Sequence, residues 1–192
     1  MQSCPNMKEA EELLREYNKS DALIKHAFAV SGVMRHFAKL AGADEEKWAV
    51  VGLLHDLDYE MYPEEHCTKS EEIMKEKGID EEYIRAVKSH GYGLCSDVEP
   101  ISGVEKTLFA IDELTGLINA ACLMRPSKSV LDIELKSVKK KYKTPSFAAG
   151  VDRSIIEKGC AALNVELDYL IQETIMGMRA CAAEIGLVGE VS

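Results

Sequence analysis

Residues 26–42, HAFAVSGVMRHFAKLAG, indicate the fold class because their apolar positions recur at helical intervals. Val30, Val33 and Phe37 follow His26 at spacings of three or four residues, which places all four on one face of a helix. That face is the apolar one, so it is expected to be buried. The pattern therefore predicts a long amphipathic helix whose buried face carries an imidazole.

The same periodicity continues along the chain, and no set of alternating Val, Ile, Thr and Tyr runs indicates a sheet. We expect helices over about 7–17, 20–40, 44–57, 68–77, 80–89, 104–124, 129–141, 152–162 and 165–185. Gly42 and Gly78 are placed to end two of them, and Thr68 with Glu71 predicts a capping box at the start of another. The fold should be all-α, a single-domain helical bundle over residues 1–192, because no connection has the length or polarity of a flexible linker.

Composition limits the classes of partner. Lys and Arg number 23 against 33 Asp and Glu, and the net charge of -10 argues against a nucleic-acid partner. The six cysteines form no CxxC pair, which fits reduced thiols in a cytoplasm. Neither an export signal nor an apolar run long enough for a membrane span is apparent. We expect a cytoplasmic protein without a nucleic-acid or membrane partner, and composition leaves the oligomeric state open.

Two further stretches place carboxylates in apolar surroundings. Residues 50–60, VVGLLHDLDYE, carry His55 and Asp56 side by side at the C-terminal end of a predicted helix, and residues 110–116, AIDELTG, carry Asp112. Burying a carboxylate without a countercharge costs several kcal/mol, whereas a divalent cation turns that cost into binding energy. The candidate ligands of one metal ion are therefore His26, His55, Asp56 and Asp112.

Each of these residues also has an ordinary explanation when taken alone. An inward His is more often a satisfied core residue than a ligand. An adjacent His-Asp pair can form a hydrogen bond at a helix end, and a buried Asp can pair with a Lys. The combination of the four residues favours the metal site.

The order His, His-Asp, Asp, each on a helix, resembles the HD-domain superfamily of metal-dependent phosphohydrolases. The resemblance extends from His26 to Asp112. It implies a helical bundle in which those four residues hold a divalent metal and Asp56 is the catalytic residue. The ligand types suit Mn, Fe, Co, Ni, Zn or Mg without choosing among them. We expect the core of the metal site within about residues 20–125 and the closing helices within about 127–186.

His66 and His90 extend the candidate ligand set. Some members of the superfamily carry two further histidines in this interval and hold two ions, with the aspartate of the pair bridging them, and these two residues resemble them. This chain departs from the common HDIG pattern by reading His-Asp-Leu-Asp, and it has Gly91 where a second consecutive His is frequent. Those departures argue against a cyclic-dinucleotide phosphodiesterase. The alternative is that both histidines lie on surface loops, so one or two ions are expected.

Residues 138–153, VKKKYKTPSFAAGVDR, form the one dense basic segment. Lys141, Lys143 and Arg153 are candidates to bind an anionic substrate group, although a solvated helix face is the ordinary explanation. Asp58 and Glu60 are possible proton carriers.

The function that these residues predict is hydrolysis of a small phosphorylated metabolite or nucleotide by a metal-activated water. Two alternatives stay open. The same six candidate ligands would serve a di-iron oxygenase of the same superfamily, and the fold could also act as a non-catalytic metal-binding sensor module.

Overall fold

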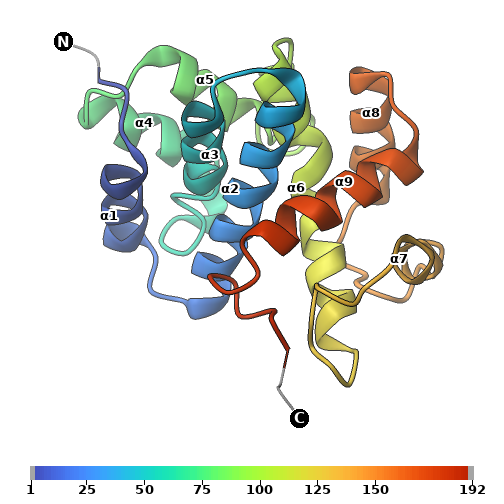
Figure 1. The fold of residues 1–192 in the computed structure, drawn as a ribbon. Helices are drawn as coiled ribbons and strands as arrows, with labels where there is room; N and C mark the ends of the chain where they lie inside the picture. The colour runs from blue at the N-terminus through green and yellow to red at the C-terminus, as the bar shows by residue number, and fades with distance from the viewer. Residues whose placement is uncertain (1–2, 190–192) are drawn as a thin grey trace.

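The computed structural model describes residues 3–189, and the regular structure there is helical, as predicted (Figure 1). Within those residues there are nine α-helices, one short 3-10 helix and no extended strand. They are α1 (Met7–Tyr17), α2 (Asp21–Ala41), α3 (Glu45–Leu54), η1 (Pro63–Glu65), α4 (Thr68–Glu76), α5 (Glu81–Ser89), α6 (Gly103–Leu123), α7 (Leu135–Tyr142), α8 (Arg153–Leu163) and α9 (Leu167–Ala180). No helix in this part of the chain has both the length and the apolar content needed to cross a membrane.

The two longest helices, α2 and α6, lie at the centre of the bundle (Figure 1). α2 packs against α3, α6 and α9, and α6 also packs against α8. Their facing side chains, including Val30, Val33, Leu108 and Ile111, are completely buried. Removing this apolar surface from water is the main force that holds the bundle together. The predicted buried face of α2 is therefore confirmed.

Several helix ends follow the local sequence signals. Gly42 ends α2 in the left-handed conformation, with φ 64°. Asp44 accepts a hydrogen bond from the Lys47 amide at the start of α3, and Asp80 accepts one from the Glu82 amide at the start of α5. Side-chain caps of this kind satisfy amides that have no partner within the helix.

The capping box predicted at Thr68 and Glu71 is wrong. Cys67 is the N-cap of α4 and makes no side-chain cap, while the Glu71 carboxylate pairs with Lys75 and Lys88. The amide of Ser70 instead donates to Oδ2 of Asp58, at 2.8 Å. Asp58, which lies in the turns after α3, therefore stabilises the first turn of α4.

Three predicted helices are longer than the observed ones, and the last of them ends at Ala180 rather than near Ile185. The third ends at Leu54, and residues 55–61 form the turns that carry the His-Asp pair. The seventh begins at Leu135, since Val130 donates its amide to the carbonyl of Leu187 and residues 129–134 are irregular. Contacts between distant segments therefore replace helical bonds that the local pattern favours.

Candidate metal centre

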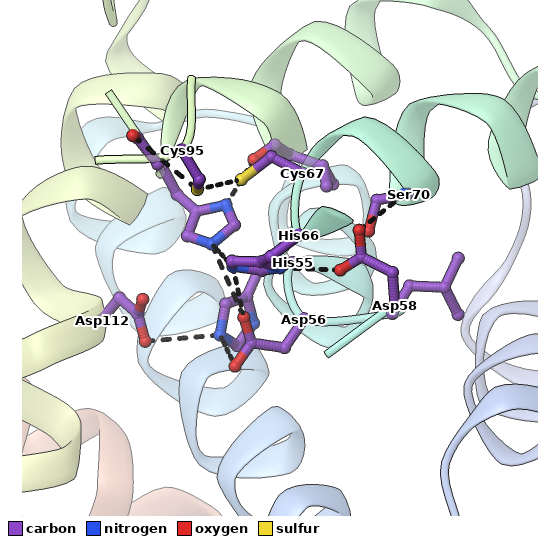
Figure 2. A network of polar contacts seen from close by, with 12 residues as sticks. His55, Asp56, Asp58, His66, Cys67, Ser70, Cys95 and Asp112 are labelled. Atoms are coloured by element: carbon purple, nitrogen blue, oxygen red, sulfur yellow. Dashed lines mark hydrogen bonds and ion pairs between the residues drawn. The ribbon is translucent and has the colours of Figure 1, made fainter. Parts of the chain in front are cut away.

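Six imidazole and carboxylate side chains converge at the C-terminal end of α3. Figure 2 labels four of them, His55, Asp56, His66 and Asp112. The six side chains come from the interiors of α2 and α6, the C-terminal end of α3, the turn after η1 and the C-terminal end of α5. These residues are His26, His55, Asp56, His66, His90 and Asp112. The structure thus brings together every residue that the sequence predicts as a metal ligand.

One half of the cluster is built around Asp112. Its Oδ1 lies 2.9 Å from Nε2 of His26 and 3.3 Å from Nε2 of His55. Oδ2 of Asp56 lies 3.2 Å from the same nitrogen of His55. Two imidazoles and two carboxylates therefore face a common point, and we call these four residues the first half.

The other half uses the second oxygen of Asp56. Its Oδ1 lies 3.4 Å from Nε2 of His66 and 3.5 Å from Nε2 of His90, and those two nitrogens are 3.2 Å apart. We call His66 and His90 the second half. The Asp56 carboxylate lies between the halves and turns one oxygen toward each.

Hydrogen bonds on the outer side fix the orientation of three imidazoles. Nδ1 of His55 and Nδ1 of His90 are each bonded to a backbone carbonyl three residues earlier, and Nδ1 of His66 lies 2.7 Å from Oδ1 of Asp58. In a neutral imidazole that donates from Nδ1, Nε2 carries a lone pair. The three Nε2 atoms point into the cluster, which is the arrangement of metal-binding histidines held by outer partners.

His55 provides the test of whether a cation fits. Its Nε2 is buried and has no hydrogen-bond partner, although it faces the carboxylates of Asp56 and Asp112. A lone pair facing two carboxylates is unfavourable unless a positive charge lies between them. Imidazole nitrogens and carboxylate oxygens are suitable ligands for divalent transition metals. The residues of the cluster therefore fit a divalent ion.

The electrostatics point in the same direction. Burial alone would lower the pKa of His55, but the carboxylates of Asp56 and Asp112 outweigh burial and raise that pKa well above its ordinary value. Burial alone would raise the pKa values of both aspartates, yet His55 outweighs it and lowers them. The cluster consequently favours positive charge at its centre.

A cavity of about 410 Å³ opens beside both halves. Its volume lies in the range of small-molecule sites. Apart from the candidate ligands, much of its wall is apolar and includes Leu94, Phe109, Val151 and Ile155. Glu113, the residue after Asp112, also lines the cavity, and burial raises its pKa. Glu113 was not among the predicted site residues, although its position directly after a candidate ligand was an available signal.

The basic segment lies elsewhere. None of the three candidate residues Lys141, Lys143 and Arg153 lines the cavity. The guanidinium of Arg153 donates to backbone carbonyls that include those of Tyr142 and Phe147, at 2.8 and 2.6 Å. The structure shows Arg153 holding the loop between α7 and α8, and substrate binding by these three residues stays a prediction.

The two acids considered as proton carriers have structural partners. Asp58 is completely buried and bonds to His66 and to the Ser70 amide, so it orients a candidate ligand. Glu60 accepts hydrogen bonds from the amides of Lys19 and Ser20 at the start of α2. Neither side chain lines the cavity.

The comparison with protein families identifies residues 23–117 as an HD domain. The matched segment begins shortly before His26 and ends shortly after Asp112, so it contains all six candidate ligands. Divalent metals and hydrolysis are typical of this family. No solved structure matches the chain significantly. The family match, the helical fold and the His, His-Asp, Asp geometry together show that the chain belongs to the HD-domain superfamily.

Proposed function

We propose that this protein is a metal-dependent phosphohydrolase that acts on a small phosphorylated metabolite or nucleotide. The observation that carries the proposal is the position of Asp56, whose Oδ1 faces the second half of the cluster while Oδ2 faces the first. A carboxylate placed in this way can hold two divalent ions. Such ions supply an activated water and neutralise the charge of a phosphoryl group during its transfer.

The residues of the chain have separate tasks in this proposal. His26, His55 and Asp112 would hold the first ion with Asp56, and His66 and His90 would hold the second. The apolar residues Leu94, Phe109, Val151 and Ile155 limit the water in the cavity and surround the part of the substrate that does not react. A cavity of about 410 Å³ accommodates a small molecule better than a polymer.

Metal analysis of the purified protein, followed by a phosphatase and phosphodiesterase screen with the metals found, tests the proposal. Asp56→Ala should lose both bound metal and phosphate release while its far-ultraviolet circular dichroism stays helical. Asp97→Ala is the matched control because Asp97 is an exposed acid outside the cluster. Normal metal content and normal turnover in Asp56→Ala would overturn the proposal.

Two outcomes of the screen would instead support the other readings of the same ligand set. Substrate-dependent oxygen uptake by an iron-loaded protein, without phosphate release, would indicate an oxygenase. A negative screen across several metals, with metal still bound, would indicate a non-catalytic sensor module.

A further inference from the structure

Two cysteines meet directly behind the second half of the cluster (Figure 2). Sγ of Cys67 and Sγ of Cys95 are 2.8 Å apart, and both residues are free thiols. Cys67 follows His66 in the chain and is completely buried. Cys95 belongs to the loop after α5, is exposed and lines the cavity. One sulfur is therefore accessible from solvent while the other is shielded behind it.

We propose that Cys67 and Cys95 are a modification site at which a peroxide forms a reversible intramolecular disulfide. A disulfide has a sulfur separation of about 2.05 Å, so the two atoms need to approach by less than 1 Å. This proposal rests on the positions of the two cysteines and does not depend on the proposed hydrolysis.

Gly91 gives the pair its space. A Cβ atom at position 91 would lie 2.3 Å from Sγ of Cys95 and 2.5 Å from Sγ of Cys67. A carbon and a sulfur that are not bonded to each other cannot approach so closely, so any side chain at position 91 would push the two sulfurs away. The glycine directly after His90 therefore allows the two thiols to meet.

The chemistry is balanced with one peroxide. The Cys95 sulfur attacks a peroxide oxygen, the oxygen–oxygen bond breaks, and a sulfenic acid and one water result. Cys67 then attacks the sulfenic sulfur, the sulfur–oxygen bond breaks, and a second water leaves as the disulfide forms. The two thiols are oxidised by two electrons in total, and hydrogen peroxide is reduced to two waters. Cys67 is the resolving thiol because its sulfur already contacts that of Cys95.

Other cysteines lack these features. Cys122 and Cys181 are buried, and among residues 3–189 Cys67 and Cys95 are the pair whose sulfurs are in contact. Cys160 is partly exposed and serves as a control thiol. Because Cys67 adjoins His66 and Cys95 follows His90 in the next loop, the disulfide would connect the segments that carry the second half.

The test is oxidation of the wild-type protein with hydrogen peroxide, in its metal-free form and after loading with zinc. Remaining thiols are alkylated, and the protein is digested without reduction for peptide mass analysis. We expect a cross-linked peptide that joins Cys67 to Cys95, lighter by two hydrogens than the sum of its parts, which dithiothreitol separates. Cys95→Ser should form no such peptide and should leave Cys67 open to alkylation after denaturation, whereas Cys160→Ser should still form it.

Two results would overturn the proposal. One is oxidation of Cys95 in the wild-type protein to sulfinic acid without any cross-link to Cys67. The other is thiolate-to-cobalt charge-transfer absorption in the cobalt-loaded wild-type protein that disappears in Cys95→Ser or Cys67→Ser, because the pair would then be a metal ligand. The wild-type peptide map decides the question even if the buried Cys67→Ser variant fails to fold. Metal content and phosphate release are measured separately, so failure here leaves the proposed hydrolysis untouched.

Discussion

Asp58 and His66 form a hydrogen bond in which Nδ1 of the imidazole donates to Oδ1 of a completely buried carboxylate, 2.7 Å away. The other oxygen of Asp58 accepts from the amide of Ser70 in the first turn of α4. One carboxylate therefore fixes both a helix start and the orientation of a candidate ligand. This contact holds the His66 imidazole of the second half of the cluster in its orientation.

Asp58→Asn tests that dependence. The amide has the size of the carboxylate but carries no charge, so it should hold the His66 imidazole less firmly. We expect the affinity for the second ion to fall about 10- to 100-fold, as for other changes to the outer partners of metal ligands. The first ion should bind as before. Metal titration followed by calorimetry measures both affinities, with the exposed Asp97→Asn as control, and two unchanged affinities would contradict the role given to Asp58.

The number of ions is tested by removing either imidazole of the second half. His66→Ala and His90→Ala should each halve the bound metal, because both Nε2 atoms face Oδ1 of Asp56 and neither belongs to the first half. His36→Ala is the matched control, since its imidazole pairs with Glu173, 2.7 Å away. Elemental analysis gives metal per chain, and full occupancy in both variants would exclude a binuclear centre.

Metal affinity should rise with pH. Burial alone lowers the pKa of His55, yet the carboxylates of Asp56 and Asp112 raise it well above 6.5. A ligand imidazole must be unprotonated, so an ion displaces this proton when it binds. Below the raised pKa of His55 the apparent affinity should increase about tenfold per pH unit for one proton released. Calorimetry in buffers of different ionisation enthalpy counts the protons, and zero release at pH 7 would refute the prediction.

The metal-free protein should show the opposite trend in stability. A pKa that is raised in the folded state contributes stability that is fully present below the unfolded value of 6.5 and is lost as pH rises through the folded value. The lowered pKa values of Asp56 and Asp112 contribute above 3.8 and are lost only as pH falls through their folded values. Urea unfolding of the metal-free protein, kept free of metal by a chelator, measures the summed contribution of these groups to the free energy of unfolding at each pH. Stability that increases above pH 6.5 would conflict with this sign.

Arg153→Gln separates a structural from a substrate-binding role. The guanidinium donates to several backbone carbonyls, and loss of hydrogen bonds from a charged group should lower the free energy of unfolding by about 1.5–3 kcal/mol. KM should stay within a factor of about two if the loop alone is affected. Lys8→Gln is the control, because Lys8 is exposed and lies outside both the cavity and the basic segment. Unfolding in urea and steady-state kinetics on a substrate from the screen give both quantities, and a large rise in KM with unchanged stability would favour substrate binding.

The sequence was sufficient to predict the helices and which six side chains would cluster, because both depend on local periodicity and on residue chemistry. α1 has the predicted limits, and the end of α2 at Gly42 follows from one glycine. The cap of α4 could not be predicted, since Asp58 lies twelve residues before Ser70 and reaches it through a turn. The meeting of Cys67 and Cys95, twenty-eight residues apart, likewise depends on how α4 and α5 pack.

The cavity wall was also beyond local reasoning. Val151 and Ile155 come from the loop before α8 and from α8 itself, and their place beside the cluster results from the packing of α8 on α6. Gly159 makes that packing possible, because a Cβ atom there would lie 2.4 Å from Cα of Ala110. The periodicity of α8 indicates a helix but carries no information about which helix it contacts.

All six candidate ligands lie within residues 23–117, whereas Val151 and Ile155 lie beyond them. The candidate metal ligands and part of the cavity wall therefore come from separate segments of the chain. A change in the C-terminal helices can alter which molecules enter without disturbing a ligand. A different arrangement of α8 on α6 would then change the shape of the cavity while the six clustered side chains stay in place.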